Sequence, residues 1–248
     1  MNNESKIREE LKISAAFKPT DVDVIMVVHN QSELVSNAIR SLEESTSDYH
    51  LYLWDNCSDQ QTVDVLASAD LKGGKLIRSK ENIGFLKPNN ELAKLGNSPY
   101  IVLLNTDVYC LPGWLEPLIG CLQNYSEIGV TGYIGGCLND EGVGSSPAWG
   151  YDVDYISGWC LAIRRSDYEK YGLFDEVNLK FAYCEDADFC FRLREVGLIT
   201  YAFCLDLVWH KGHATSFSID PNVLGDPFVK NHAYMRKKWQ KYLGRSIK

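Results

Sequence analysis

DVIMVV, at residues 23–28, is a short and almost uninterrupted apolar run, and the polar residues HNQS at 29–32 follow it directly. Such a run is typical of a parallel strand that is buried on both faces. Apolar residues at helical spacing come next, over residues 34–42, and a second run, LYLW at 51–54, ends in the polar residues DNCSD at 55–59. The order strand, helix, strand predicts a βαβ unit.

The same alternation continues along the first half of the chain. The spacing predicts helices over 61–69 and 88–95 and strands over 75–78 and 100–104. Alternating strands and helices indicate an α/β fold built on a doubly wound, mainly parallel sheet. Sheets of this kind bind ligands beyond the carboxyl ends of their strands, and a polar cluster follows each of the four predicted strands. We therefore expect a site assembled from four loops.

The second half of the chain has a different pattern of apolar residues. Short apolar runs separated by glycines follow residue 125, and the pattern then predicts a strand over 155–163 and a helix over 186–196. No repeat or low-complexity linker separates this part, so we expect an extension of the same sheet that walls the crevice. The expected organisation is a leader over 1–20, one domain over 21–229, and a basic amphipathic helix over 230–248.

Length and composition bound the functional class. The chain has 248 residues, of which 45% are hydrophobic, enough for one large domain with a full core. The 33 acidic residues outnumber the 25 Lys and Arg residues, so nucleic acid is not expected as a partner. No apolar stretch reaches the ~18 residues of a membrane-spanning helix, and MNNESKIREELKIS at the N-terminus is too charged for a signal peptide. The expected localisation is cytoplasmic.

The cysteines carry information about the redox state of the chain. Eight are present, without a CxxC pair and without zinc-type spacing. This pattern predicts reduced thiols, mostly in the core, rather than a disulfide framework.

Positive charge is concentrated at the end of the chain. Residues 230–248 contain seven Lys or Arg and no acid, and an apolar stripe recurs there at the spacing of an amphipathic helix. One interpretation is a terminal helix docked on the domain. The other is a helix that rests on an anionic surface at the inner face of the membrane, or that steers a phosphorylated ligand. The stripe consists of Met235, Trp239, Tyr242 and Leu243.

The loops after the first three predicted strands carry carboxylate and amide side chains. No GxGxxG motif follows the first strand and no GxxxxGK[ST] motif occurs anywhere, which disfavours nicotinamide enzymes and P-loop NTPases. Instead, Asp55 ends the second strand and the sequence NIGF at 82–85 follows the third. Such groups suit the hydrogen-bonding edges of a base and the hydroxyls of a ribose.

An acidic residue, Asp107, follows the fourth predicted strand in the sequence NTD at 105–107. Oxygen ligands suit Mg²⁺ or Mn²⁺, which takes one or two protein carboxylates and completes its shell with water and ligand phosphate. The alternative is a carboxylate that caps a turn or a helix. His210 and His213 stand near the end of the sheet, but without a third His or Cys nearby they do not make a zinc motif.

Three carboxylates fall within four residues in the sequence EDAD at 185–188, just ahead of apolar residues at helical spacing. In the first turn of a helix they would satisfy the helix dipole. The same place can hold a general base. The helix N-terminus lowers the pKa of a carboxyl group there, whereas burial and like charges raise it, so the sequence leaves the pKa open.

Taken together, these loops resemble the family-2 glycosyltransferases, enzymes of GT-A fold, and in particular their rhamnosyltransferase-like branch, which builds bacterial surface polysaccharides. The resemblance covers residues 23–210, in the order and approximate spacing of the family. Each matching segment is weak alone, and their specificity lies in the order of all seven. The segments are VVHN ending at Asn30, WDNCSD at 54–59, ENIGFLKPNN at 81–90, LLNTD at 103–107, SGWCLAIRR at 157–165, GLFDE at 172–176 and CEDADFCFRLREVG at 184–197.

The resemblance implies a donor pocket for a nucleoside-diphosphate sugar. In it, Asp55 would read the base or the ribose, and Asn82 with Gly84 would line the same pocket. Asn30 and Asn105 are further donor-pocket residues that the resemblance implies. Asn105 stands where the metal motif of the family often has a second acid.

The resemblance also implies a metal site, a base and an acceptor pocket. Asp107 would hold the divalent cation, Mg²⁺ or Mn²⁺, that bridges the diphosphate. His210, or else His213, would complete the metal shell. Asp186 would be the base that deprotonates the acceptor hydroxyl. The acceptor or sugar pocket would include Glu185 and Trp159, whose alternative is an ordinary buried aromatic residue.

The implied reaction is a single in-line displacement with inversion at the anomeric carbon. The donor would be a UDP- or dTDP-linked sugar, and the acceptor a glycan or a lipid-linked molecule. A rival hypothesis is a catalytically inactive relative that binds the sugar nucleotide as a sensor or partner subunit. A nucleotidyltransferase is a third hypothesis, but the glycine-rich basic loop that it would need after the first strand is missing.

Overall fold

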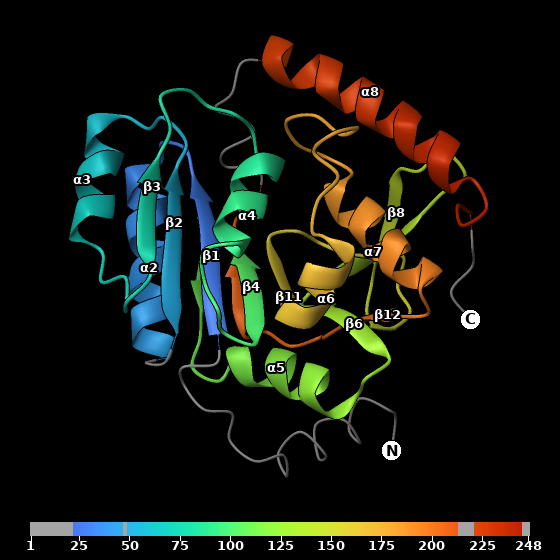
Figure 1. Ribbon diagram of the computed structural model, residues 1–248, viewed down its shortest axis with the longest axis horizontal. Helices are drawn as coiled ribbons and strands as arrows, with labels where there is room; N and C mark the ends of the chain where they lie inside the picture. Colours follow the sequence, from blue (N-terminus) through green and yellow to red (C-terminus); the bar gives the residue numbers. More distant parts are fainter. Residues whose placement is uncertain (1–21, 47–48, 213–220, 245–248) are drawn as a thin grey trace.

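The first predicted strand becomes the centre of the parallel half of a large sheet. The computed structural model describes residues 22–46, 49–212 and 221–244. In it, β1 (Val22–Val28) lies between β2 (His50–Asp55) and β4 (Tyr100–Leu104), and β3 (Lys75–Arg78) pairs with β2 at the edge. All three pairings are parallel, which confirms the predicted α/β class and the mainly parallel sheet (Figure 1).

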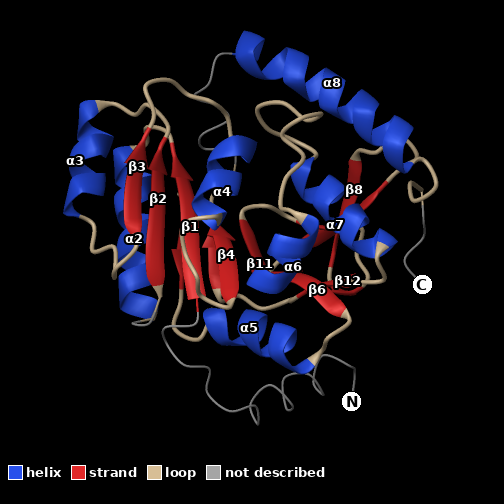
Figure 2. Ribbon diagram, viewed as in Figure 1, coloured by secondary structure: helices blue, strands red, loops and turns tan. Residues whose placement is uncertain are grey.

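Helices cover both faces of this sheet, as the doubly wound prediction requires (Figure 2). Alternate residues of β1 point to opposite faces. Val24 and Met26 belong to one core cluster, and Ile25 belongs to the other. The first cluster includes α2 (Ser32–Ser45), α3 (Gln60–Ser68) and α5 (Leu115–Asn124), and the second includes α4 (Leu86–Ala93) and α7 (Glu185–Glu195), with α6 (Arg165–Tyr171) packed against it.

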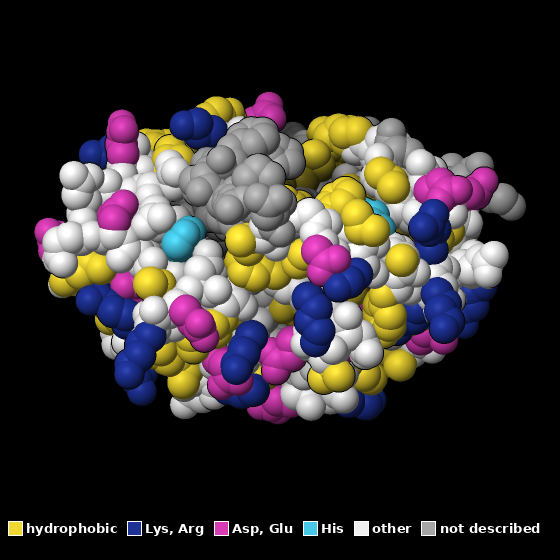
Figure 3. All heavy atoms as spheres, turned by 90° about the horizontal axis from the view of Figure 1, so that it is seen from above, with side chains coloured by type: hydrophobic (Ala, Val, Ile, Leu, Met, Phe, Trp, Pro, Cys, Tyr) yellow, Lys and Arg dark blue, Asp and Glu magenta, His cyan; other side chains and the backbone are white. Residues whose placement is uncertain are grey.

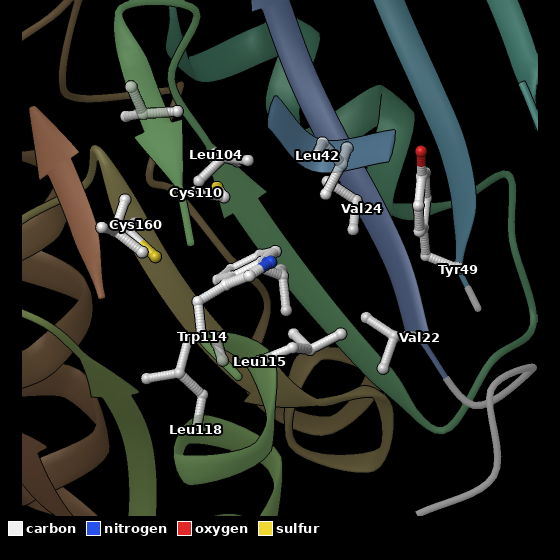
Figure 4. Packing of buried hydrophobic residues seen from close by; sticks show 14 of the residues in the cluster. Val22, Val24, Leu42, Tyr49, Leu104, Cys110, Trp114, Leu115, Leu118 and Cys160 are labelled. Carbon is white, nitrogen blue, oxygen red and sulfur yellow. The ribbon is translucent and has the colours of Figure 1, made fainter. Parts of the chain in front are cut away.

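Trp114 is the largest fully buried side chain of the first cluster. Its ring lies among Leu104 of β4, Val24 of β1 and Cys160 (Figure 4). Burial of such a side chain removes a large apolar area from water, so this layer stabilises the strand ends that carry the loops.

The predicted extension of the sheet is antiparallel where it joins β4. There β11 (Cys160–Arg164) pairs antiparallel with both β4 and β6 (Ile128–Gly132). Two more strands, β12 (Ile199–Ala202) and β9 (Gly150–Tyr151), complete an eight-stranded sheet. Two small sheets lie beside it: β10 (Tyr155–Ile156) with β7 (Gly135–Leu138) and β8 (Gly144–Ala148), and β13 (Val208–His210) with β5 (Val108–Cys110).

The prediction of one continuous strand over 155–163 is wrong. The chain forms β10 and β11 in two different sheets, with a turn at residues 157–159 between them. The Ser157 N–H donates to the Ile134 carbonyl at 2.9 Å, and the Cys160 N–H donates back to the Ser157 carbonyl at 3.3 Å. These two bonds close the turn, and the apolar pattern does not reveal it because residues on both sides are buried.

The last helix, α8 (Pro221–Trp239), begins ahead of the predicted start at residue 230. It lies across the end of the molecule toward which β1 to β4 point their carboxyl ends (Figure 1). Its Met235 and Trp239 are buried and pack against Ala187 and Phe191. That part of the apolar stripe is therefore occupied by the domain and is not free to enter a bilayer. None of the described helices has the length and apolarity needed to cross a membrane.

Some expectations concern residues outside the described ranges. The leader at 1–20 and His213 both fall there. All eight cysteines lie within the described ranges as free thiols, and four of them, Cys110, Cys121, Cys160 and Cys190, are buried.

Candidate active site

Hydrogen bonds tie the loop after β1 to the loop after β2. The Asn30 N–H donates to Ser58 Oγ at 3.0 Å, and Asn30 Oδ1 accepts from the Asp59 N–H at 2.8 Å. The His29 ring is bonded to the Asn56 carbonyl at 2.9 Å. Asn30, one of the predicted donor-pocket residues, therefore clamps two of the four strand-end loops together.

Asn56 joins the third loop to the first two. Its Nδ2 donates to Asn82 Oδ1 at 2.7 Å and to the Gly84 carbonyl at 2.8 Å, and its Oδ1 accepts from the Ile83 N–H at 3.0 Å. A buried amide that makes three bonds fixes the shape of the loop that it bonds. Sequence reasoning did not single out this residue. The available signal was an amide next to Asp55, directly after a buried strand.

Asp55 is fully buried at the end of β2, and both of its carboxylate oxygens have partners. Oδ1 accepts from the Ser58 N–H at 2.8 Å, and Oδ2 lies 2.7 Å from Arg78 Nε at the end of β3. A buried carboxylate needs such a counter-charge. The Arg78 side chain is 49% exposed, so this arginine, which the sequence analysis did not name, presents donors at the same edge of the sheet.

Gly84 stands where the third loop meets the segment before α7. Its φ of +86° lies in the left-handed region, and a Cβ there would come within 2.5 Å of the Phe181 carbonyl oxygen. The next residue, Phe85, donates its N–H to that same oxygen at 2.6 Å. Only glycine allows both this conformation and this close approach. The loop that carries Asn82 is therefore fixed against the segment that leads to the acidic residues.

Asp107 and His210 come together at the end of β4, although they are far apart in the sequence. His210 Nε2 lies 3.1 Å from Asp107 Oδ1, and the Asp107 side chain is 6% exposed. The ring of Trp159 stacks on the His210 ring, with centroids 4.8 Å apart and planes 14° from parallel. The Asn105 N–H donates to the Trp159 carbonyl at 2.8 Å. Trp159 therefore contacts His210 through its ring and Asn105 through its backbone carbonyl.

The donor set at Asp107 and His210 is suited to a divalent cation that is shared with a ligand. Within the described ranges no group of three His, Cys, Asp or Glu residues is arranged to hold a metal. A carboxylate oxygen and an imidazole nitrogen lie 3.1 Å apart. Mg²⁺ and Mn²⁺ commonly take so few protein ligands when phosphates supply the others. The residues present therefore fit a cation that completes its shell with a diphosphate.

Asp186 lies in the first turn of α7 and is held by backbone donors. Its Oδ2 accepts from the Gly158 N–H at 3.2 Å, and its Oδ1 accepts from the Ala187 N–H at 2.8 Å. Gly158 belongs to the turn at 157–159, and the next residue is Trp159, which stacks on His210. One turn therefore contacts both the predicted base and the predicted metal ligand.

Glu185 and Asp186 form a pair of acids with perturbed protonation. Burial and the neighbouring charge of Asp186 raise the pKa of Glu185 to about 8. Burial also raises the pKa of Asp186, but the amides of Ala187 and Gly158 oppose this rise because they bond the ionised form. The histidine on α8, His232, acts in the same direction as these amides. The amides of Gly158 and Ala187 favour the ionised form of Asp186, so the shared proton of the pair is favoured on Glu185.

Comparison with protein families and curated proteins identifies relatives of the chain. The model of glycosyl transferase family 2 matches residues 23–172. Succinoglycan biosynthesis protein ExoU of Rhizobium meliloti is 28% identical over 106 residues, which are 42% of this chain and 31% of that protein. The N-acetylglucosaminyl-diphospho-decaprenol L-rhamnosyltransferase of Mycobacterium tuberculosis is 41% identical over 64 residues, 25% of this chain and 20% of that protein. The matches thus span about a third and a fifth of these relatives.

Solved structures share the fold at low sequence identity. GalNAc-T7 with UDP, GalNAc and Mn²⁺ aligns with a TM-score of 0.66 and 15% identity, over 77% of this chain and 44% of that one. The mannosyltransferase PcManGT from Pyrobaculum calidifontis, in complex with GDP-Man and Mn²⁺, aligns with a TM-score of 0.62 and 16% identity, over 95% of this chain and 71% of that one. These likenesses establish the fold.

Proposed function

The chain belongs to glycosyl transferase family 2 and has the GT-A fold, and from this premise we propose that it transfers a sugar from a nucleoside-diphosphate sugar to an acceptor hydroxyl with inversion at the anomeric carbon. The observation that carries the proposal is the turn at 157–159. It bonds Asp186 through the Gly158 N–H and stacks on His210 through Trp159. One turn therefore contacts both the proposed proton acceptor and the proposed leaving-group site, and positioning of these two groups relative to each other is what a single displacement needs.

The nucleoside of the donor is assigned to the loops after β1, β2 and β3. Arg78, whose guanidinium is anchored by the buried Asp55 carboxylate, presents donors at this edge, and Asn56 fixes the loop that carries Asn82 and Gly84. Such groups complement the hydrogen-bonding edges of a base and ribose hydroxyls. The proposed donor is UDP- or dTDP-linked.

The diphosphate of the donor is assigned to the end of β4. Asp107 and His210 would hold a divalent cation there, and the cation would supply charge neutralisation for the departing nucleoside diphosphate. Trp159 restricts the ring of His210 by stacking on it, and the Asn105 N–H fixes the backbone of Trp159. These contacts keep the nitrogen of His210 directed at Asp107, so the site is formed before the donor binds.

Asp186 is the residue to which we assign proton abstraction. Its carboxylate is held by two amides, and its raised pKa makes it a stronger base than an exposed aspartate. It accepts the proton of the acceptor hydroxyl as the oxygen of that hydroxyl bonds the anomeric carbon and the bond to the diphosphate breaks. Glu185, protonated at neutral pH, lies beside it as a hydrogen-bond donor for the sugar or acceptor.

A glycan or a lipid-linked glycan is the proposed acceptor. The support is the similarity to a succinoglycan biosynthesis protein and to a rhamnosyltransferase that is named for N-acetylglucosaminyl-diphospho-decaprenol. On the face onto which the strand ends open, hydrophobic side chains gather on the half that α8 occupies (Figure 3). An acceptor with an apolar portion suits such a surface.

Calorimetric binding of free nucleotides tests the proposal. UDP, dTDP, GDP and CDP are each titrated into the protein with and without Mn²⁺. We expect one nucleotide to bind selectively, and Mn²⁺ to strengthen this binding. Absence of binding by all four nucleotides would contradict the donor site, and with it both the enzyme and the sugar-nucleotide-binding relative. Equal binding with and without Mn²⁺ would remove the metal from the proposal.

A further inference from the structure

The segment just before the two acids has an unusual backbone. Phe181, Tyr183 and Cys184 all have positive φ, at 64°, 78° and 69°. Non-glycine residues in the left-handed region cost free energy, and several of them so close together persist only where neighbouring groups hold them. Cys184 is also the residue directly before α7, so the conformation of this segment sets the direction in which Glu185 and Asp186 leave it.

A single side chain on α8 bonds this segment from one side. Asn231 is fully buried, and its Oδ1 accepts from the Lys180 N–H at 3.0 Å. Its Nδ2 donates to the carbonyl oxygens of Lys180 and Ala182 at 2.9 Å each and to that of Tyr183 at 3.1 Å. Both polar atoms of the amide are therefore used on three residues of the segment, Lys180, Ala182 and Tyr183, and none of these four bonds is made to α8 itself.

The donor loop bonds the same segment from the other side. The Phe85 N–H donates to the Phe181 carbonyl at 2.6 Å, and Gly84 packs so closely that a Cβ would lie 2.7 Å from Phe181 Cα. The segment 180–184 is thus held between the loop of Asn82 on one side and Asn231 on the other. A shift of the segment would move both the donor loop and the acids.

We propose that Asn231 is a positioning residue for the active site: its amide fixes the segment 180–184, which in turn places Glu185 and Asp186 and supports the donor loop at Gly84. The assignment of roles to these acids rests on the proposed function. The contact between Asn231 and residues 180–183, here called the clamp, rests on the four hydrogen bonds alone. The residue has no counterpart in the motifs of the sequence analysis, where it lies within a helix characterised by its basic charge and its apolar stripe.

The other anchors of α8 separate this role from simple docking of the helix. The Tyr234 hydroxyl donates to Asp175 Oδ2 at 3.0 Å, and the Trp239 Nε1–H donates to Asp188 Oδ1 at 2.8 Å. These bonds attach α8 to the domain without contacting residues 180–184. Tyr234→Phe is therefore a matched control that loosens α8 and leaves the clamp intact.

Cys184 offers a readout that does not depend on catalysis. It lies at the end of the clamped segment and is partly buried, and burial together with the nearby carboxylates raises the pKa of its thiol. The thiolate is the reactive form, so Cys184 should react slowly with iodoacetamide while the segment is fixed. Cys57 is exposed in another loop and serves as the internal reference, and the buried Cys110 and Cys160 report global unfolding.

The experiment measures alkylation of each cysteine in the full chain by peptide mass spectrometry between pH 7 and pH 10. The variants are Asn231→Asp, which keeps the size but places a carboxylate against three carbonyls, and the milder Asn231→Ser. We expect Cys184 to react at least tenfold faster in both variants, with its pH profile shifted to lower pH, while Cys57, Cys110 and Cys160 react as in the wild type. Tyr234→Phe should leave Cys184 unchanged.

Two outcomes would overturn the proposal. The first is a wild-type rate at Cys184 in an Asn231 variant whose Cys110 and Cys160 stay protected. The second is an equal acceleration in Tyr234→Phe, which would make Asn231 an ordinary helix anchor. If Asn231→Asp unfolds the chain, the alkylation rate of Cys184 in Asn231→Ser alone tests the proposal. Because no substrate is used, this result stands apart from the nucleotide titrations, and each proposal can fail without the other.

Discussion

His210 Nε2 lies 3.1 Å from Asp107 Oδ1, and this contact joins the third residue of β13 to the loop after β4. The antiparallel pairing of β13 with β5 creates it, because the register places His210 opposite Val108, the residue next to Asp107. Trp159 then stacks on the histidine from the turn that also bonds Asp186. The two-stranded sheet is small, but it determines where a cation and a diphosphate would meet the predicted base.

The first prediction concerns Asp107 and His210. Asp107→Ala and His210→Ala should each weaken Mn²⁺-dependent nucleotide binding about tenfold or more, a loss of roughly 1.4 kcal/mol or more, because each removes a donor from a set of two. Calorimetric titration of the selected nucleotide with and without Mn²⁺ measures the effect. His50→Ala is the control, since His50 bonds the Lys72 carbonyl at the start of β2. Binding in His210→Ala equal to that of His50→Ala would contradict the assignment of His210.

The second prediction separates backbone conformation from close approach at Gly84. Gly84 and Gly113 have almost the same φ, +86° and +87°, but nothing lies within 4 Å of a Cβ built at Gly113. Gly113→Ala should therefore lower the free energy of unfolding by about 1–2 kcal/mol, the cost of a left-handed alanine. Gly84→Ala should lower it further and also weaken nucleotide binding, because the Phe181 backbone must shift. Urea denaturation and calorimetry measure the two effects, and equal losses in both variants would refute the close-approach argument.

The third prediction is a pH dependence of stability from Glu185. In the folded chain the Glu185 carboxyl group has a pKa of about 8 and keeps its proton below that pH. In the unfolded chain it has the usual pKa of 4.5 and loses the proton there. The folded state therefore binds more protons between these values, and the free energy of unfolding should fall as the pH rises through that window. Glu185→Gln, which cannot ionise, should flatten this slope. Denaturation at pH 5, 6, 7 and 8 tests it, with the exposed Glu169→Gln as the control that keeps the wild-type slope.

The parallel half of the fold could be predicted from the sequence because buried parallel strands leave a simple pattern. Residues 23–28, 51–54 and 100–104 are almost continuous apolar runs and 75–78 has an apolar centre, and each reappears within one of the first four strands of the main sheet. Polar residues follow the strands for the same physical reason that ligands bind there. The strand-end loops that carry the candidate site residues can therefore be predicted without the structure.

The turn at 157–159 could not be predicted in the same way. Ile156 and Cys160 are both buried, so an apolar pattern joins β10 and β11 into one strand. Only the pairing of β10 with β7 and of β11 with β4 separates them, and pairing partners are not a local property of the sequence. The roles of Asn56 and Asn231 are hidden for a related reason. Each is a common polar residue whose side-chain partners lie at least 23 positions away.

The fourth prediction distinguishes a base from a helix-dipole role among the acids of α7. Asp186 bonds the amides of Gly158 and Ala187, whereas Asp188 is fully buried and bonds Arg192, Lys238 and Trp239. If Asp186 takes the acceptor proton, Asp186→Asn should lower turnover by about 10²–10⁴-fold. Nucleotide binding should remain close to that of the wild type, because the hydrogen bonds of this side chain go to Gly158 and Ala187 and the nucleoside is assigned to the loops after β1 to β3.

Asp188→Asn should show the opposite pattern. It leaves two cationic side chains and an indole N–H with a weaker acceptor, so the free energy of unfolding should fall by about 1–3 kcal/mol while turnover of the folded protein changes little. If the acids served only the helix dipole, each substitution would cost about 0.3–1 kcal/mol of stability, with no large loss of turnover in either. Sugar release from the donor at saturating acceptor, measured beside urea denaturation for both variants, decides between these patterns. Near-normal turnover in Asp186→Asn would show that another group takes the proton.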